Sequence, residues 1–321
     1  MFETLVAASP EFAQPYVKST LDAFYLLFSV GIISVLFLEI FKRVERLFIK
    51  EDNPNWRIVH KERPFFKREF RSELCWPILN AIFLVPLLAL EHYLLVELFL
   101  QRHLPQQPLA GLIEQLPFFV QVVLGLFVLD LILYIRHRFV HHFFWPYHTI
   151  HHSAREITWL TTLRLHPIDT FVMGIILTTL LYIIGFGGEG IALANIIQFH
   201  FNRFAHSNLA LDFPGPLRYI LVSPNMHRWH HAADDPRAFN KNYAIVFAFI
   251  DVLFGTFYVP KNRLPNVYGV LDEHGEQVVS ERYVDQLVYP LRHHRSWIGR
   301  KWSTIQTRLS TRQALKKSKT P

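Results

Sequence analysis

Four long apolar blocks restrict this chain to helices that lie in a membrane. They cover Thr20–Phe41, Leu74–Leu100, Leu116–Ile135 and Ile168–Ile184. A helix needs about 20 predominantly apolar residues to cross a hydrocarbon core of about 30 Å. Hydrophobic residues make up 51% of the 321-residue chain, whereas a soluble domain is about 45–50% apolar even when glycine is counted. We therefore predict an all-α integral membrane bundle with about four membrane-embedded blocks.

The charges between the blocks predict how the bundle is oriented. Residues 42–73 carry ten Lys/Arg and six Asp/Glu, and the positive-inside rule places such a loop in the cytoplasm. After the fourth block, the glycine-rich residues 185–190 form a turn, and residues 191–199 return as the second arm of a hairpin. From Gln286 onward, nine Lys/Arg are accompanied by no acid. The expected parts are N-terminal spans in 1–115, a core domain in 116–260 and a basic cytoplasmic tail in 261–321.

Charge and cysteine content exclude two classes of protein. The net charge of +7 is placed beside apolar blocks, so it indicates contact with anionic headgroups rather than with nucleic acid. Cys75 is the single cysteine. The chain therefore forms no internal disulfide and carries no iron–sulfur cluster, which would need several thiolates.

Histidine is the second defining feature, because twelve of the 18 histidines fall between His137 and His231. Three patterns carry them: His137-Arg-Phe-Val-His141, His148-Thr-Ile-His151-His152 and His227-Arg-Trp-His230-His231. Spacings of three and four residues place side chains on one helix face. Eight imidazoles exceed the four ligands of a structural zinc site, so the patterns predict two metal ions. Imidazole suits iron, copper, zinc and nickel, so the metal is left open.

The predicted topology puts all of these histidines on one side of the membrane. They emerge at the cytoplasmic ends of the blocks, where they would form a histidine-rich helical cap. Asp130 and Tyr134 continue the face of the first histidine pattern into the third block. For Asp130 two interpretations stay open: an ion pair with Arg136 or Arg164, or a carboxylate that accepts the free N–H of a metal-bound histidine.

The residues between about 130 and 260 resemble the fatty acid hydroxylase/sterol desaturase superfamily. Besides the three histidine patterns, the resemblance is carried by Arg164-Leu-His166-Pro167, His206-Ser207-Asn208, Asn242-Tyr243 and Asp251-Val-Leu-Phe-Gly255-Thr256-Phe257. It implies an integral membrane enzyme in which histidines hold two non-haem irons that activate O₂. One departure is Ile135-Arg136, where the superfamily more often has an aromatic residue.

Carried over to this sequence, the resemblance assigns the eight pattern histidines as metal ligands. It adds His206 as a ninth ligand and places His166, Asn208 and Asn242, together with Asp130 and Tyr134, around the ligands as supporting residues. His142 points about 100° away from His141 on a helix, and His200 lies off the face of His206, so neither is included.

The expected function is oxidation of a lipid, by hydroxylation or desaturation, with O₂ and two electrons. The chain has no haem, flavin or nicotinamide motif, so we expect an external donor: a cytochrome b5-like protein, or a ferredoxin with its reductase. Two alternatives remain. A zinc-dependent membrane lipid hydrolase could use the same cage, since zinc can replace iron in a purified protein, but no HExxH glutamate is present. A non-enzymatic metal-binding membrane protein would need polar residues along several spans, whereas the histidines here lie beyond the ends of the apolar blocks.

Overall fold

The computed structural model describes residues 36, 38–44, 47, 68–80, 82, 85–104, 109–185, 188–261 and 263–299. Within these residues the regular structure is helical, and strand-like pairing is limited to the isolated bridges of Ala232 with Tyr268 and of Leu271 with Gln277. The prediction of an all-α fold is confirmed for this part of the chain.

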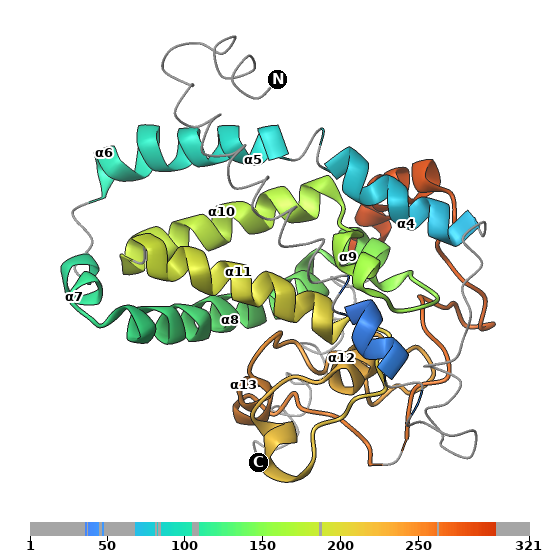
Figure 1. The fold of residues 1–321 in the computed structure, drawn as a ribbon. Helices are drawn as coiled ribbons and strands as arrows, with labels where there is room; N and C mark the ends of the chain where they lie inside the picture. Colours follow the sequence, from blue (N-terminus) through green and yellow to red (C-terminus); the bar gives the residue numbers. More distant parts are fainter. Residues whose placement is uncertain are drawn as a thin grey trace, which may run out of the picture.

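The named helices follow one another along the described chain, with the longest connection, residues 231–247, between α12 and α13 (Figure 1). In chain order they are α4 (Arg68–Leu79), α5 (Val85–His92), the π-helix η3 (Tyr93–Leu100), α6 (Gln101–His103), α7 (Ala110–Glu114), α8 (Phe118–Phe143), α9 (Trp145–His152), the 3₁₀ turn η4 (Trp159–Leu163), α10 (Pro167–Ile184), α11 (Gly188–Ala205), the 3₁₀ turn η5 (Gly215–Tyr219), α12 (Pro224–His230) and α13 (Ala248–Leu253).

Two of the described helices, α8 and α10, are long and apolar enough to cross a membrane. They contain 26 and 18 residues, which correspond to about 39 and 27 Å at a rise of 1.5 Å per residue. The predicted block Leu74–Leu100 is divided among the end of α4, α5 and η3. The predicted block Thr20–Phe41 lies mainly outside the described residues. Four membrane-embedded blocks therefore stay a prediction, while two candidate spans are observed.

Helices α8 and α11 pack closely because glycine lies at their contact. A Cβ atom on Gly125 of α8 would lie 3.1 Å from Ile191 and 3.3 Å from Ala194 of α11. A Cβ atom on Gly190 of α11 would lie 2.7 Å from the Cβ of Gln121 in α8. Small residues at such positions let helix backbones approach, as is common in membrane bundles.

Helices α10 and α11 form the two arms of the predicted hairpin. The first arm ends at Gly185, whose φ of 83° is left-handed and is readily adopted by glycine. The Gly185 N–H donates to the carbonyls of Leu181 and Tyr182. The second arm starts at Gly188. Figure 1 shows this turn at the end of the bundle opposite to α9 and α12, the helices that carry two of the histidine patterns.

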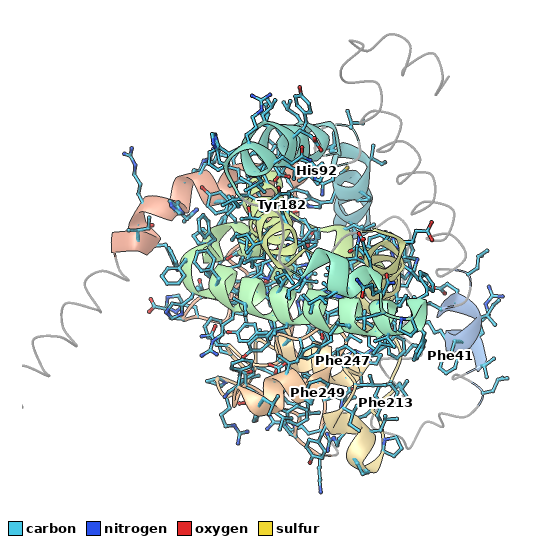
Figure 2. The ribbon with its side chains drawn as sticks, turned by 90° about the vertical axis from the view of Figure 1, so that its left-hand side faces the viewer. Phe41, His92, Tyr182, Phe213, Phe247 and Phe249 are labelled. Carbon is cyan, nitrogen blue, oxygen red and sulfur yellow. The ribbon has the colours of Figure 1, made fainter. Side chains whose placement is uncertain are left out.

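The segment around residues 243–254 is fastened to the middle of α8 by one buried carboxylate. Asp130 is completely buried and accepts the backbone N–H groups of Ile245, Val246 and Phe247 at 2.9, 3.1 and 2.7 Å. The ring of Phe247 also contacts Phe127 of α8 with a centroid distance of 6.3 Å. Figure 2 shows Phe247 and Phe249 beside the α8 ribbon. Asp130 thus binds backbone, in contrast to both interpretations of the sequence.

Within the predicted C-terminal tail, residues 283–299 form a helix that packs on the domain. The indole N–H of Trp76 in α4 donates to Oε1 of Gln286 at 2.8 Å, and both residues are fully buried. Tyr283 and Leu287 pack against a small cluster that includes Trp76 and Ile150. Residues 300–321 lie outside the described part of the chain.

The role of Asp130 in the fold gives a first prediction. In Asp130→Asn one of the two oxygens becomes an NH₂ group, so three backbone N–H groups compete for a single acceptor. Unsatisfied buried donors cost about 1–3 kcal/mol each. We expect the free energy of unfolding to fall by about 2–3 kcal/mol, measured by denaturation of the purified protein in detergent. Asp272→Asn is the control, because that carboxylate accepts N–H groups of His274 and Glu276 at an exposed turn. Equal effects of both changes would contradict the prediction.

Candidate metal centre

The structure brings all nine predicted histidines together in two adjacent groups. Within each group the ligand nitrogens lie within 4.8 Å of one another. The first group contains five histidines and the second four: His137, His141, His148, His152 and His230, and then His151, His206, His227 and His231. Eight of the nine side chains are buried, and His137 is partly buried.

Two short helices and the end of a long one place the histidines of the three patterns. The third pattern lies on α12, whose N-terminus is capped by the Ser223 hydroxyl, which accepts the Met226 N–H at 3.1 Å. Pro224 fills the first helical position, where its missing N–H costs nothing. The second pattern lies on α9, which begins with Trp145 and Pro146. The first pattern occupies the last two turns of α8.

Each HxxHH pattern supplies both groups. On α9, His148 and His152 join the first group while His151 joins the second. On α12 the division is reversed, because His227 and His231 join the second group and His230 the first. Successive helical residues point about 100° apart whereas residues four apart share a face, so the spacing itself divides the ligands between two centres.

The backbone fixes which ring nitrogen carries the proton in four of these histidines. Nδ1 of His137 lies 2.9 Å from the Tyr243 carbonyl oxygen, and Nδ1 of His230 lies 2.7 Å from that of Lys241. In the second group, Nδ1 of His151 lies 3.1 Å from the carbonyl oxygen of Thr161. Nδ1 of His206 likewise lies 2.9 Å from the carbonyl oxygen of Asn202. A carbonyl only accepts hydrogen bonds, so each Nδ1 is protonated and each Nε2 presents a lone pair.

These lone pairs point at one another, which is the arrangement that a cation requires. The Nε2 atoms of His151 and His206 are 3.1 Å apart although both are acceptors. The Nε2 atom of His230 is buried and has no hydrogen-bond partner. Two nitrogens bound at about 2.1 Å to one metal, at right angles, lie about 3.0 Å apart. Observed Nε2 separations of 2.8–3.2 Å therefore fit the edges of metal coordination spheres.

Burial keeps the imidazoles in the neutral form that binds metals. Burial lowers the pKa of His206 to about 3 and the pKa of His230 to about 4. It also lowers the pKa of His151, His227 and His231 well below the usual value, and neighbouring histidines add to the effect. All five are therefore neutral near pH 7, so metal does not have to displace a proton from them.

The carboxylate that contacts a histidine is Asp169, which the sequence did not single out. Its Oδ2 accepts the Nδ1 proton of His148 at 3.1 Å, and both residues are buried. The contact expected of Asp130 is thus made by a residue at the start of α10. The sequence contained only a weak indication of this role for Asp169. The residue follows the Arg-Leu-His-Pro element by two residues, and an acid near a histidine cluster is a candidate orienting group.

The other predicted supporting residues hold the surrounding backbone. The Tyr134 hydroxyl lies 2.9 Å from Oγ1 of Thr256. His166 caps α10 by accepting the Ile168 N–H through Nδ1. Asn242 donates to the carbonyl of Met226, directly before the third histidine pattern. The remaining positions lie as follows: Asn208 is partly buried two residues after His206, His142 is exposed, and His200 lies outside both groups.

Fold and site together define a helical protein with two membrane-length helices and two histidine groups able to hold metal ions. The sequence model of the fatty acid hydroxylase family matches residues 122–256, which include all nine histidines. Residues 122–256 are thus similar to the fatty acid hydroxylase family, as the sequence motifs indicated, and α8 and α10 are candidate membrane spans.

Several characterised proteins are similar to the same part of the chain. Ornithine lipid hydroxylase OlsE of Rhizobium tropici is 30% identical over 179 residues, 55% of this chain and 52% of that protein. Alkylglycerol monooxygenase of Caenorhabditis elegans is 32% identical over 148 residues, 46% of this chain and 28% of that protein. Very-long-chain aldehyde decarbonylase GL1-1 of Oryza sativa subsp. indica is 27% identical over 168 residues, 48% of this chain and 25% of that protein.

The matched region spans about half or less of the length of each of these relatives. No solved structure matches the chain.

The contact between Asp169 and His148 gives a second prediction. Asp169→Leu removes the acceptor that orients His148, and loss of such a partner typically costs 10–100-fold in metal affinity. We expect a loss of this size, measured as metal retained during dialysis of the metal-loaded protein against graded chelator concentrations. Asp169→Asn keeps an acceptor oxygen in place and should lose less. Identical metal retention by the wild type and Asp169→Leu would show that the contact does not support the site.

Proposed function

We propose that this protein is a membrane-bound non-haem di-iron oxygenase that hydroxylates or desaturates a lipid. The observation that carries the proposal is the division of nine histidines into a group of five and a group of four, with their nitrogens directed inward. The match to the fatty acid hydroxylase family supports iron over the other metals that imidazole binds. The names of the relatives, a lipid hydroxylase and monooxygenases, support lipid oxidation.

In this proposal each histidine group holds one iron ion. The irons supply the activation of O₂ that oxidation of an unactivated C–H bond requires. For hydroxylation, one oxygen atom enters the C–H bond and the other leaves as water, which consumes two electrons and two protons. The residues of the chain hold the neutral Nε2 lone pairs in place through the Tyr243, Lys241, Thr161 and Asn202 carbonyls.

Aromatic rings cover the first histidine group and reduce its contact with water. The Tyr243 ring lies edge-on to His137, His141 and His230, with centroid distances of 5.4, 5.1 and 5.7 Å. The Trp145 ring lies 5.0 Å from the ring of His141. A site shielded in this way keeps a reactive oxidant from solvent and strengthens the electrostatic interactions inside it.

Lipid access follows from the fold. The α8 and α10 helices are candidate membrane spans, and α8 itself carries His137 and His141 at its end. A lipid in the bilayer would therefore reach the site by moving along these helices. We further propose that the site faces the cytoplasm and that the spans number about four, because the basic residues 42–73 follow the first predicted block.

The electrons come from a separate protein in this proposal. The sequence has one cysteine and no flavin or haem motif, so the donor is a cytochrome b5-like protein or a ferredoxin with its reductase. Basic residues in 42–73 and after Gln286 would suit an acidic donor.

His230 gives the test of this function. Its ring contacts His137, His141 and His152 of the first group, and its Nε2 has no other partner. We expect His230→Ala to lose at least about a hundredfold in O₂-dependent lipid oxidation, as for loss of a group that acts on the reacting centre. Product is measured by lipid mass spectrometry in cells that lack the endogenous protein, together with iron content of the purified chain.

His142→Ala is the matched control, because His142 follows His141 directly but is exposed and outside both groups. It should retain wild-type iron and activity. Zinc without iron in the protein purified from cells, with lipid turnover that continues without O₂, would overturn the oxygenase and favour a hydrolase.

A further inference from the structure

A buried arginine without an acidic partner lies one helical turn before the metal centre. Arg203 of α11 is 7% exposed, and its Nε and Nη1 atoms are buried without a hydrogen-bond partner. Among the described residues, no carboxylate forms an ion pair with it. Buried charges in proteins are normally paired, because desolvating an unpaired charge costs several kcal/mol. An arginine in this state indicates a missing anion.

The stacking of Arg203 on an aromatic ring leaves its donors available. Its guanidinium carbon lies 3.8 Å from the centroid of the Phe199 ring. Stacking on an aromatic face holds the guanidinium plane, while the N–H groups point outward along the edge of that plane. The edge of a guanidinium matches the two oxygens of a carboxylate or phosphate.

Two neighbours in the chain have unused hydrogen-bonding capacity as well. His200 lies three residues before Arg203, which places these two side chains on one side of α11, and Ser207 lies two residues beyond the end of the helix at Ala205. Both ring nitrogens of His200 are buried without a partner, and so is Oγ of Ser207. Arginine offers donors alone, and histidine and serine can each add one, so the cluster suits a ligand that accepts several hydrogen bonds.

The approach to this cluster is apolar. Leu193 and Ile197 lie seven and three residues before His200 on α11, and each is 37% exposed. Residues at these spacings share a helix face. An alkyl chain lying along them would bring its polar end to His200 and Arg203. This continuity favours a lipid over a small soluble anion.

We propose that Arg203, with His200 and Ser207, binds the carboxylate or phosphate of an anionic lipid headgroup. Resting on the proposed function, this lipid is the substrate that the metal centre oxidises. His206, a residue of the second histidine group, follows Arg203 by three residues, about 4.5 Å along the helix axis. The headgroup is thereby bound beside the metal centre, and anionic lipids are selected over neutral ones.

Lipid retention by the purified, metal-loaded full chain tests this assignment without turnover. Native mass spectrometry in neutral detergent compares dioleoyl phosphatidic acid with dioleoylglycerol, which share acyl chains and differ in the phosphate. We expect the wild type to retain phosphatidic acid preferentially. Arg203→Gln should reduce that retention about tenfold, because charge-assisted hydrogen bonds are lost, and Arg203→Lys should reduce it less.

Arg292→Gln is the matched control, since it removes the same charge from an exposed position of the 283–299 helix. If Arg203→Gln is not monodisperse on size exclusion, phosphatidic acid retention is compared in Ser207→Ala and Arg203→Lys instead. Each of these variants should lose several-fold in retention. Equal retention of both lipids by the wild type, or equal losses in the Arg203 and Arg292 variants, would overturn the inference. Displacement of the lipid by inorganic phosphate at the same concentration would identify a free-anion site and overturn the lipid assignment.

Turnover separates this inference from the proposed function. If the wild type retains phosphatidic acid selectively yet oxidises no lipid, the oxygenase proposal fails while the anion site stands. If the wild type oxidises dioleoylglycerol as fast as phosphatidic acid, and Arg203→Gln leaves both rates unchanged, the oxygenase stands and the headgroup site fails.

Discussion

The hydrogen bonds between histidine Nδ1 atoms and backbone carbonyls are the interaction on which the site depends. A neutral imidazole donates from one nitrogen and accepts at the other. A proton fixed on Nδ1 therefore leaves the lone pair on Nε2, which points inward. Four residues of the site are fixed in this way by carbonyls: His137, His151, His206 and His230. Burial then prevents protonation of His206 and His230, whose pKa values fall to about 3 and 4. The inward lone pairs repel one another unless a cation lies among them.

Two of these carbonyls, those of Lys241 and Tyr243, belong to a segment that is held by two buried carboxylates. Asp251 accepts the N–H groups of Tyr243 and Ala244 at 2.9 and 2.8 Å. Asp130 accepts the next three N–H groups along the chain from the middle of α8. The segment that supplies the Lys241 and Tyr243 carbonyls is thus tied to the same helix that carries His137. Two buried acids therefore act on the metal centre through the backbone rather than by touching a ligand.

Much of the site was predictable because helical spacing converts sequence into geometry. The three histidine patterns determine which side chains share a face, and His206 was found through the His-Ser-Asn element. The backbone acceptors were not predictable, since any residue at position 161 or 241 would present a carbonyl. Asp130 shows the same limit: its place on the face of His137 was correct, but its partners come from residues 245–247, which only the fold brings near. Asp169 was missed because one acid near a helix start has many ordinary roles.

For the fold, the continuous apolar runs of the sequence predicted the positions of the two long helices. Helices α8 and α10 appear where continuous apolar runs predicted them. The block Leu74–Leu100 contains Pro77, Pro86 and two glutamates, and it is divided among three helices. The packing of the 283–299 helix on Trp76 depends on a contact 210 residues apart in sequence, which no local pattern encodes.

The sharing of α9 and α12 between the two histidine groups has a thermodynamic consequence. Each of these short helices supplies ligands to both groups. Ordering one helix therefore costs conformational entropy once for the two groups together. An ion that enters one group and orders both helices leaves the other group preformed. In the proposed form with an ion in each group, this ordering would favour binding of the second ion, and by linkage the benefit would be mutual. The ordering of the shared helices would then favour molecules in which both centres are filled or both are empty.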